Sequence, residues 1–80
     1  MWTNDYSQAL SGATGSDISI PDEDSLLDFT RRVAHGSERK NAPLATFLAG
    51  WYVANRVAAG IDAETAWQEA AGMGDNLLED

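Results

Sequence analysis

The sequence contains no cysteine, one histidine and two prolines among its 80 residues. Without cysteine the chain has neither disulfides nor thiolate metal ligands, so a packed core must supply its stability. A single histidine does not make a zinc site, and Asp22-Glu23-Asp24 lacks the spacing of a Ca²⁺ loop. We therefore expect no metal, no cofactor and no catalytic residue, and a protein that is not an enzyme.

Basic residues are also scarce, because five Lys and Arg stand against 13 Asp and Glu and give a net charge of −8. Such a surface repels nucleic-acid phosphates and anionic lipids, so we expect no nucleic-acid partner. The sequence does not open on a basic segment followed by an apolar run, and the apolar stretch 42–54 is too short to cross a bilayer. These features predict a cytoplasmic protein that does not enter membranes.

The chain does have seven aromatic residues, and its apolar positions are spaced three and four residues apart. This is the period of amphipathic helices, and it predicts four of them, at about 3–13, 22–36, 42–59 and 62–78. Short connections favour a compact bundle or orthogonal array, so the predicted fold class is all-α, with residues 1–80 as a single helical domain. The third helix is apolar on most sides, which is typical of a central helix.

Polar residues at three of the expected helix starts are good N-caps. Ser19 or Asp22 is placed to cap the second helix, Asn41 the third and Asp62 the fourth. Their side-chain oxygens accept hydrogen bonds from backbone N–H groups that otherwise lack partners. The predicted boundaries therefore have a local cause in addition to the apolar period.

Glycines mark the other ends. Gly36 and Gly60 are placed to end the second and third helices. Gly72 and Gly74 fall inside the fourth helix, where each costs about 1 kcal/mol relative to alanine. The second half of that helix is therefore predicted to be weak.

Four of the five basic residues fall within ten positions, just before the third helix. The candidate residues of an anion- or partner-binding corner are His35, Arg39, Lys40 and Asn41. Free N–H groups at the start of the third helix would add to their attraction for a nucleotide phosphate or a carboxylate. The alternative is structural: the basic side chains neutralise Glu38 and Asp28, and the His35 imidazole meets the last carbonyl groups of the second helix.

Trp51, Tyr52 and Trp67 have two interpretations. At helical spacing in a short domain, large aromatic residues usually form the core. If one face of the third helix is left uncovered, the same residues become a docking surface for a partner protein or a second copy of the chain. Their exposure decides between core and interface.

One short segment resembles an acyl carrier protein. Asp24-Ser25-Leu26 stands at a helix start in a small acidic chain, as the modified serine does in that family. The resemblance implies that Ser25 would be the attachment site of phosphopantetheine. It covers the tripeptide and the composition, and it remains an alternative function.

A longer resemblance covers residues 22–50, with its specific parts at 26–28, 33–36 and 42–50. This stretch resembles a small bacterial domain of unknown function, found alone or joined to molybdopterin-guanine dinucleotide biosynthesis proteins. The resemblance implies an accessory role beside the guanylyltransferase that attaches a nucleotide to molybdenum cofactor. It carries no catalytic residue, and it names that guanylyltransferase as the expected protein partner.

Overall fold

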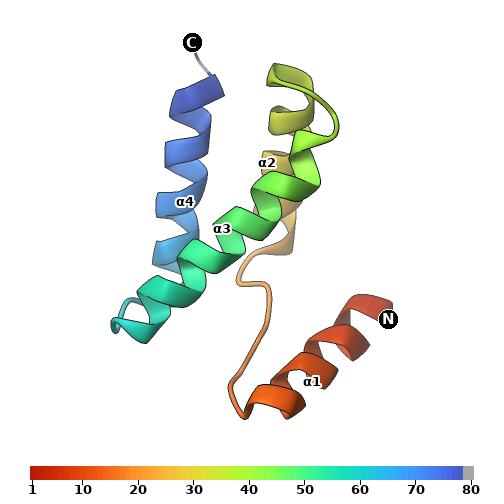
Figure 1. The fold of residues 1–80 in the computed structure, drawn as a ribbon, viewed down its shortest axis with the longest axis vertical. Coiled ribbons are helices and arrows are strands. Elements are labelled where there is room, and N and C mark those ends of the chain that lie inside the picture. The colour runs from red at the N-terminus through yellow and green to blue at the C-terminus, as the bar shows by residue number, and fades with distance from the viewer. Residues whose placement is uncertain (79–80) are drawn as a thin grey trace.

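A computed structural model describes residues 1–78, which form four helices in the order α1 (Trp2–Thr14), α2 (Glu23–Gly36), α3 (Asn41–Ala58) and α4 (Ala63–Leu78) (Figure 1). The described residues contain no strand. The predicted all-α fold with four helices is confirmed, and each predicted boundary lies within one residue of the observed one. The helix bounds follow from local sequence, as the caps show.

Two of the predicted caps form as expected. Asp22 accepts a hydrogen bond from the Ser25 backbone N–H at 3.0 Å, and Asp62 accepts one from Thr65 at 3.2 Å. The Thr65 bonds also hold the pKa of Asp62 below its ordinary value, because they stabilise the carboxylate. Gly60 follows α3 with a φ of 97°, a conformation that favours glycine.

Two predicted end contacts are wrong. Lys40, in a helical conformation, occupies the N-cap position of α3, and Asn41 is already the first helical residue. The Asn41 side chain instead donates to the Ser37 hydroxyl at 3.2 Å. At the end of α2 it is Ser37, not His35, that bonds the Val33 carbonyl, through its hydroxyl at 2.7 Å and its N–H at 3.0 Å.

The core lies between α2, α3 and α4, which contact one another. Its buried members are Phe29, Val33, Ala49, Ala66 and Trp67. The rings of Phe29 and Trp67 meet edge to face with centroids 5.4 Å apart, a favourable aromatic geometry. The Trp67 indole N–H donates to the Ser25 hydroxyl at 2.9 Å, so the largest core side chain keeps its polar atom bonded.

Helix α1 stands apart from this core. Within residues 1–78 it makes no contact with another helix, and none of its residues is buried (Figure 1). It holds the following linker instead, because the hydroxyls of Ser7 and Ser11 bond the backbone of Ile18. The chain's radius of gyration is accordingly 13.0 Å, against about 11.6 Å for a compact domain of this length.

Candidate interaction surface

Large apolar side chains line the outer side of α3, where no other helix of the described chain covers them. They are Leu44, Phe47, Leu48 and Trp51, each more than half exposed. Their spacing of three and four residues places them on one side of the helix. The opposite side packs against α2 and α4 through smaller residues, among them Ala45 and Ala49. Helix α3 thus packs on the core mainly through alanines and Val53, while four of its largest apolar side chains face solvent.

This surface continues onto α4 across a shallow apolar groove of about 280 Å³. Leu48 and Tyr52 line the groove from α3, and Met73 and Leu77 line it from α4. Met73 is half exposed and Leu77 is 78% exposed. We call the six exposed residues together the α3–α4 face: Leu44, Phe47, Leu48, Trp51, Met73 and Leu77.

The three aromatic residues proposed for the interface differ in their exposure to solvent. Trp67 is only 4% exposed and belongs to the core, so it is removed from the candidate interface. Trp51 is 61% exposed, and its ring meets that of Phe47 edge to face at 5.9 Å. Tyr52 is half-buried between these environments. Only Trp51 therefore has the exposure that a docking residue needs.

The inner rim of the groove is held by a polar cluster of three side chains. Glu69 accepts hydrogen bonds from the Tyr52 hydroxyl at 2.9 Å and from Arg56 Nε at 3.1 Å. The bond from Arg56, followed by that from Tyr52, holds the pKa of Glu69 below its ordinary value. The bond to Glu69 likewise raises the pKa of Tyr52. The cluster ties α3 to α4 and fixes the ring that lines the groove.

This cluster predicts a specific acid sensitivity. Because the pKa of Glu69 is lower in the folded chain than in the unfolded chain, its stabilisation is present above the ordinary value of 4.5 and is lost as the pH falls through the folded pKa. Urea unfolding from pH 7 to pH 3 should therefore show a smaller loss of stability for Glu69→Gln than for the wild type. Glu64→Gln, at an exposed position of the same helix with no ion pair within residues 1–78, is the matched control. Equal acid dependence for all three proteins would refute this role of Glu69.

The basic corner before α3 is less suited to anions than the sequence indicated. The N–H of Asn41 donates to the Glu38 carbonyl at 2.9 Å, and the N–H of Ala42 donates to that of Arg39 at 3.2 Å. Pro43 has no N–H. The first backbone donors of α3 are therefore occupied or missing, and the predicted use of free N–H groups is wrong.

The side chains around this corner are exposed and partly neutralised. Lys40 lies 3.4 Å from Glu38, as the structural alternative predicted. Asp28, the other predicted partner, pairs with Arg31, a basic residue of the same cluster, at 2.8 Å. Arg39 has no ion pair within residues 1–78 and is exposed. Among the described residues, Arg39 is thus a cation that a partner could contact.

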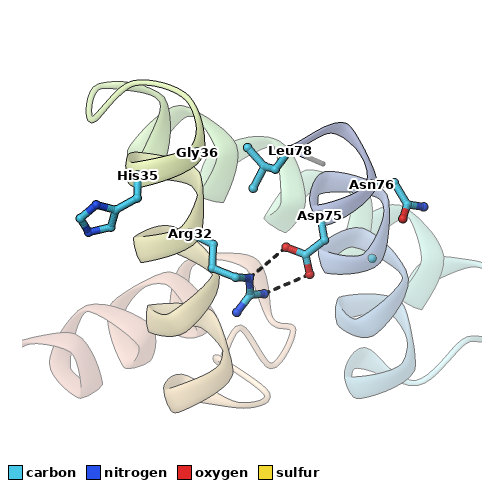
Figure 2. A pocket seen from close by; sticks show the side chains of 7 residues that line it. Arg32, His35, Gly36, Asp75, Asn76 and Leu78 are labelled. Atoms are coloured by element: carbon cyan, nitrogen blue, oxygen red, sulfur yellow. Dashed lines mark hydrogen bonds and ion pairs between the residues drawn. The ribbon is translucent and has the colours of Figure 1, made fainter. Parts of the chain in front are cut away.

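His35 lies beside an open groove between the ends of α2 and α4 (Figure 2). In that groove Arg32 donates to both carboxylate oxygens of Asp75, at 2.9 and 3.1 Å. The His35 imidazole points away from this ion pair (Figure 2). His35 therefore does not join Arg32 in a common anion site, and the Arg32 guanidinium is already used to hold α2 against α4.

A family model for a domain of unknown function, DUF6457, matches residues 1–80. The chain belongs to the DUF6457 family. Searches of curated proteins and of solved structures give no match for this DUF6457 domain. The expected identity as a small domain of unknown function is thus confirmed in its general form.

None of the helices in the described part of the DUF6457 domain combines the length and the apolar character needed to cross a bilayer. Across residues 1–78, no three side chains among His, Asp and Glu gather into a metal-binding group.

Ser25, the candidate attachment site of phosphopantetheine, is half-buried, and its hydroxyl accepts a hydrogen bond from the Trp67 indole N–H. The structure gives Ser25 a part in the core of the DUF6457 domain.

Sequence reasoning missed the α4 side of the surface. Met73 and Leu77 share a side of α4 at a spacing of four residues, but the apolar period alone merges them with Trp67 into one broad stripe. That stripe is broad enough for two sides, and the structure buries only one of them in the DUF6457 core. The exposed side of α3 could have been predicted from its sequence, because alanines fall on the side opposite the large residues of the α3–α4 face.

Proposed function

We propose that the DUF6457 domain is a protein-association domain without catalytic activity, and that it associates through the α3–α4 face. The observation that carries the proposal is the continuity of this face, with six large apolar side chains on two adjacent helices. Contiguous exposed apolar surface of this kind marks interaction sites, and aromatic residues and Met are enriched in the centres of interfaces.

The local electrostatics of α3 support the same proposal. Its only charged residue is Arg56, which is bonded to Glu69 on the inner side. A partner that approaches Phe47 and Trp51 therefore desolvates no charge on α3, and burial of unpaired charge is what most often opposes association. Arg39, in the turn two residues before the start of α3, is placed to contact an acidic group at the rim of such an interface.

The resemblance of residues 22–50 supports a more specific role. It suggests an accessory function beside the guanylyltransferase of molybdenum-cofactor biosynthesis, with that enzyme as a partner protein. The polar clusters of the domain support the absence of catalysis, because the carboxylates of Glu69 and Asp75 are both engaged by arginines in structural ion pairs. The proposal therefore assigns binding to this domain and chemistry to its partner.

Substituting Phe47 with lysine tests the surface directly. We expect Phe47→Lys to weaken association, with itself or with the guanylyltransferase of the same organism, at least tenfold, because it places a charge in the centre of the apolar face. Val57→Lys is the matched control, since Val57 is an exposed apolar residue of α3 outside that face. The measurement is sedimentation velocity of the purified domain alone and mixed with the enzyme.

Circular dichroism should show equal helix content in the wild type and both variants, because both sites are exposed. The proposal fails if the wild-type domain stays monomeric and does not bind the enzyme at any concentration tested. It also fails if Phe47→Lys associates as tightly as Val57→Lys.

A further inference from the structure

Within residues 1–78, the α3–α4 face and one side of α1 are apolar surfaces that no other helix covers. Trp2 is 71% exposed and Tyr6 52%, and their rings lie 5.0 Å apart on one side of that helix. Neither ring contributes to the core, since α1 contacts no other helix within the described chain. A small chain thus carries an uncovered aromatic helix and an uncovered apolar groove.

The exposed area exceeds what a monomer of this size normally shows. The chain exposes 5872 Å², whereas a folded monomer of 8.6 kDa exposes about 4,700 Å². The excess of about 1,200 Å² is larger than the ~800 Å² that each partner buries in a standard interface. The chain therefore has the surface that one stable dimer contact would remove.

Charge restricts where two copies can meet. Each copy carries a net charge of −8, so contacts between charged surfaces of two copies are repulsive. Helices α1 and α3 are the exceptions, because Asp5 is the only charged residue of α1 and Arg56, already paired, is the only one of α3. On α4, which lines the other side of the groove, Glu69 and Asp75 are paired with Arg56 and Arg32. The two uncovered faces are thus faces that two copies can bring together with little repulsion.

The linker makes an exchange of α1 compatible with the observed fold. Ser7 and Ser11 bind Ile18, so α1 and the start of the linker form one unit, and the chain then leads away to α2 (Figure 1). Moving this unit onto another copy breaks no contact with the core, because it makes none with the other helices. Reciprocal exchange of one helix is a closed, two-fold arrangement that satisfies both chains.

We propose that a second copy of this chain covers the α3–α4 face by laying its α1 along the groove, with Trp2 and Tyr6 against Leu48 and Met73. Each copy gives one helix and receives one, in the helix-in-groove mode of recognition. The inference rests on the proposed function, because it names the occupant of the same face. In such a dimer, Arg39 stays outside the groove-lining residues.

The first test is the mass of the purified chain in solution, measured by light scattering from micromolar to millimolar concentration. We expect about 17 kDa, twice the 8.6 kDa of one chain. Tyr6→Lys and Phe47→Lys should each raise the dissociation constant at least tenfold, whereas Val57→Lys should leave it unchanged. If Tyr6→Lys leaves the dissociation constant of the dimer unchanged, the proposed placement of α1 is wrong.

The second test uses the absence of cysteine. Two differently tagged single-cysteine variants, Tyr6→Cys and Leu48→Cys, are mixed and treated with a short bismaleimide. The proposal predicts a crosslink between the two tags, and a much lower yield when Leu48→Cys is replaced by Val57→Cys. Equal yields with both partners would overturn the proposed pairing of α1 with the groove.

The outcomes separate this inference from the function on which it rests. A chain that is monomeric at every concentration overturns the second copy as occupant, yet the association function stands if Phe47→Lys abolishes binding to the guanylyltransferase. If Phe47→Lys changes neither self-association nor enzyme binding, both fail.

Discussion

Replacing Trp67 with alanine is expected to lower the free energy of unfolding by about 3–5 kcal/mol, the usual cost of truncating a buried Trp. The side chain is 4% exposed, and its ring packs edge to face on Phe29. The substitution also leaves the Ser25 hydroxyl without its indole partner. A domain of 80 residues has a total stability of about 4–12 kcal/mol, so this loss removes from about a quarter to all of that stability. Circular dichroism during urea unfolding measures the effect.

Trp51→Ala provides the control, because it removes the same side chain from a position that is 61% exposed. In the monomer, Trp51→Ala should change the free energy of unfolding by no more than about 0.5 kcal/mol in either direction. If the chain dimerises through the α3–α4 face, the cost of Trp51→Ala will grow with protein concentration, while that of Trp67→Ala will persist at every dilution. Comparable costs for the two variants at low concentration would contradict the assignment of Trp67 to the core and Trp51 to the surface.

The second large effect is expected at Gly74. A Cβ at this position would lie 2.7 Å from Cζ of Phe29, which is closer than carbon atoms approach. Because Phe29 is buried against Trp67, its ring cannot move without disturbing the core. We expect Gly74→Ala to cost about 1–3 kcal/mol, the usual penalty of overpacking, despite the higher helix propensity of alanine.

Gly72 gives the matched comparison two residues earlier in α4. A Cβ there meets no atom within 4 Å from the rest of residues 1–78, the nearby backbone of α4 aside, so Gly72→Ala should stabilise the chain by up to about 1 kcal/mol. Thermal unfolding of the two variants should therefore shift in opposite directions. Shifts of the same sign would show that propensity, and not the close approach of α4 to Phe29, governs this helix.

The two glycines also show where sequence reasoning reaches its limit. Propensity alone gives Gly72 and Gly74 the same cost. The structure separates them because Gly74 lies where α4 approaches Phe29, 45 positions earlier in the chain. A contact between residues so far apart in sequence leaves no local signal, and the same holds for the Arg32–Asp75 ion pair.

The helix boundaries, by contrast, were predictable because their causes are local. Asp22, Asp62 and Gly60 act within four residues of the helix ends that they define. The prediction that Asn41 caps α3 was wrong because the turn at Glu38 and Pro43 let the helix start one residue earlier, with Lys40 in helical conformation. Local rules thus located the start of α3 to within one residue but assigned the wrong residue to its N-cap position.

The candidate site was only partly predictable. A helix that is apolar on two sides does not reveal from its period which side is covered, and α3 buries the side with Ala45 and Ala49. For α1, the period placed Trp2 and Tyr6 on one side but did not identify what that side contacts. Exposure of Trp51, burial of Trp67 and separation of α1 are results of tertiary packing.

The separation of α1 from the core has a consequence for how this family can diversify. Trp2 and Tyr6 form a surface that makes no contact with α2, α3 or α4 of the same chain, so substitutions there leave the packing within each chain unchanged. Most proteins must balance a gain in recognition against a loss of folding, because the same residues serve both. Here the two requirements fall on different segments, so the specificity of association can drift or be redesigned while the folded core stays as it is.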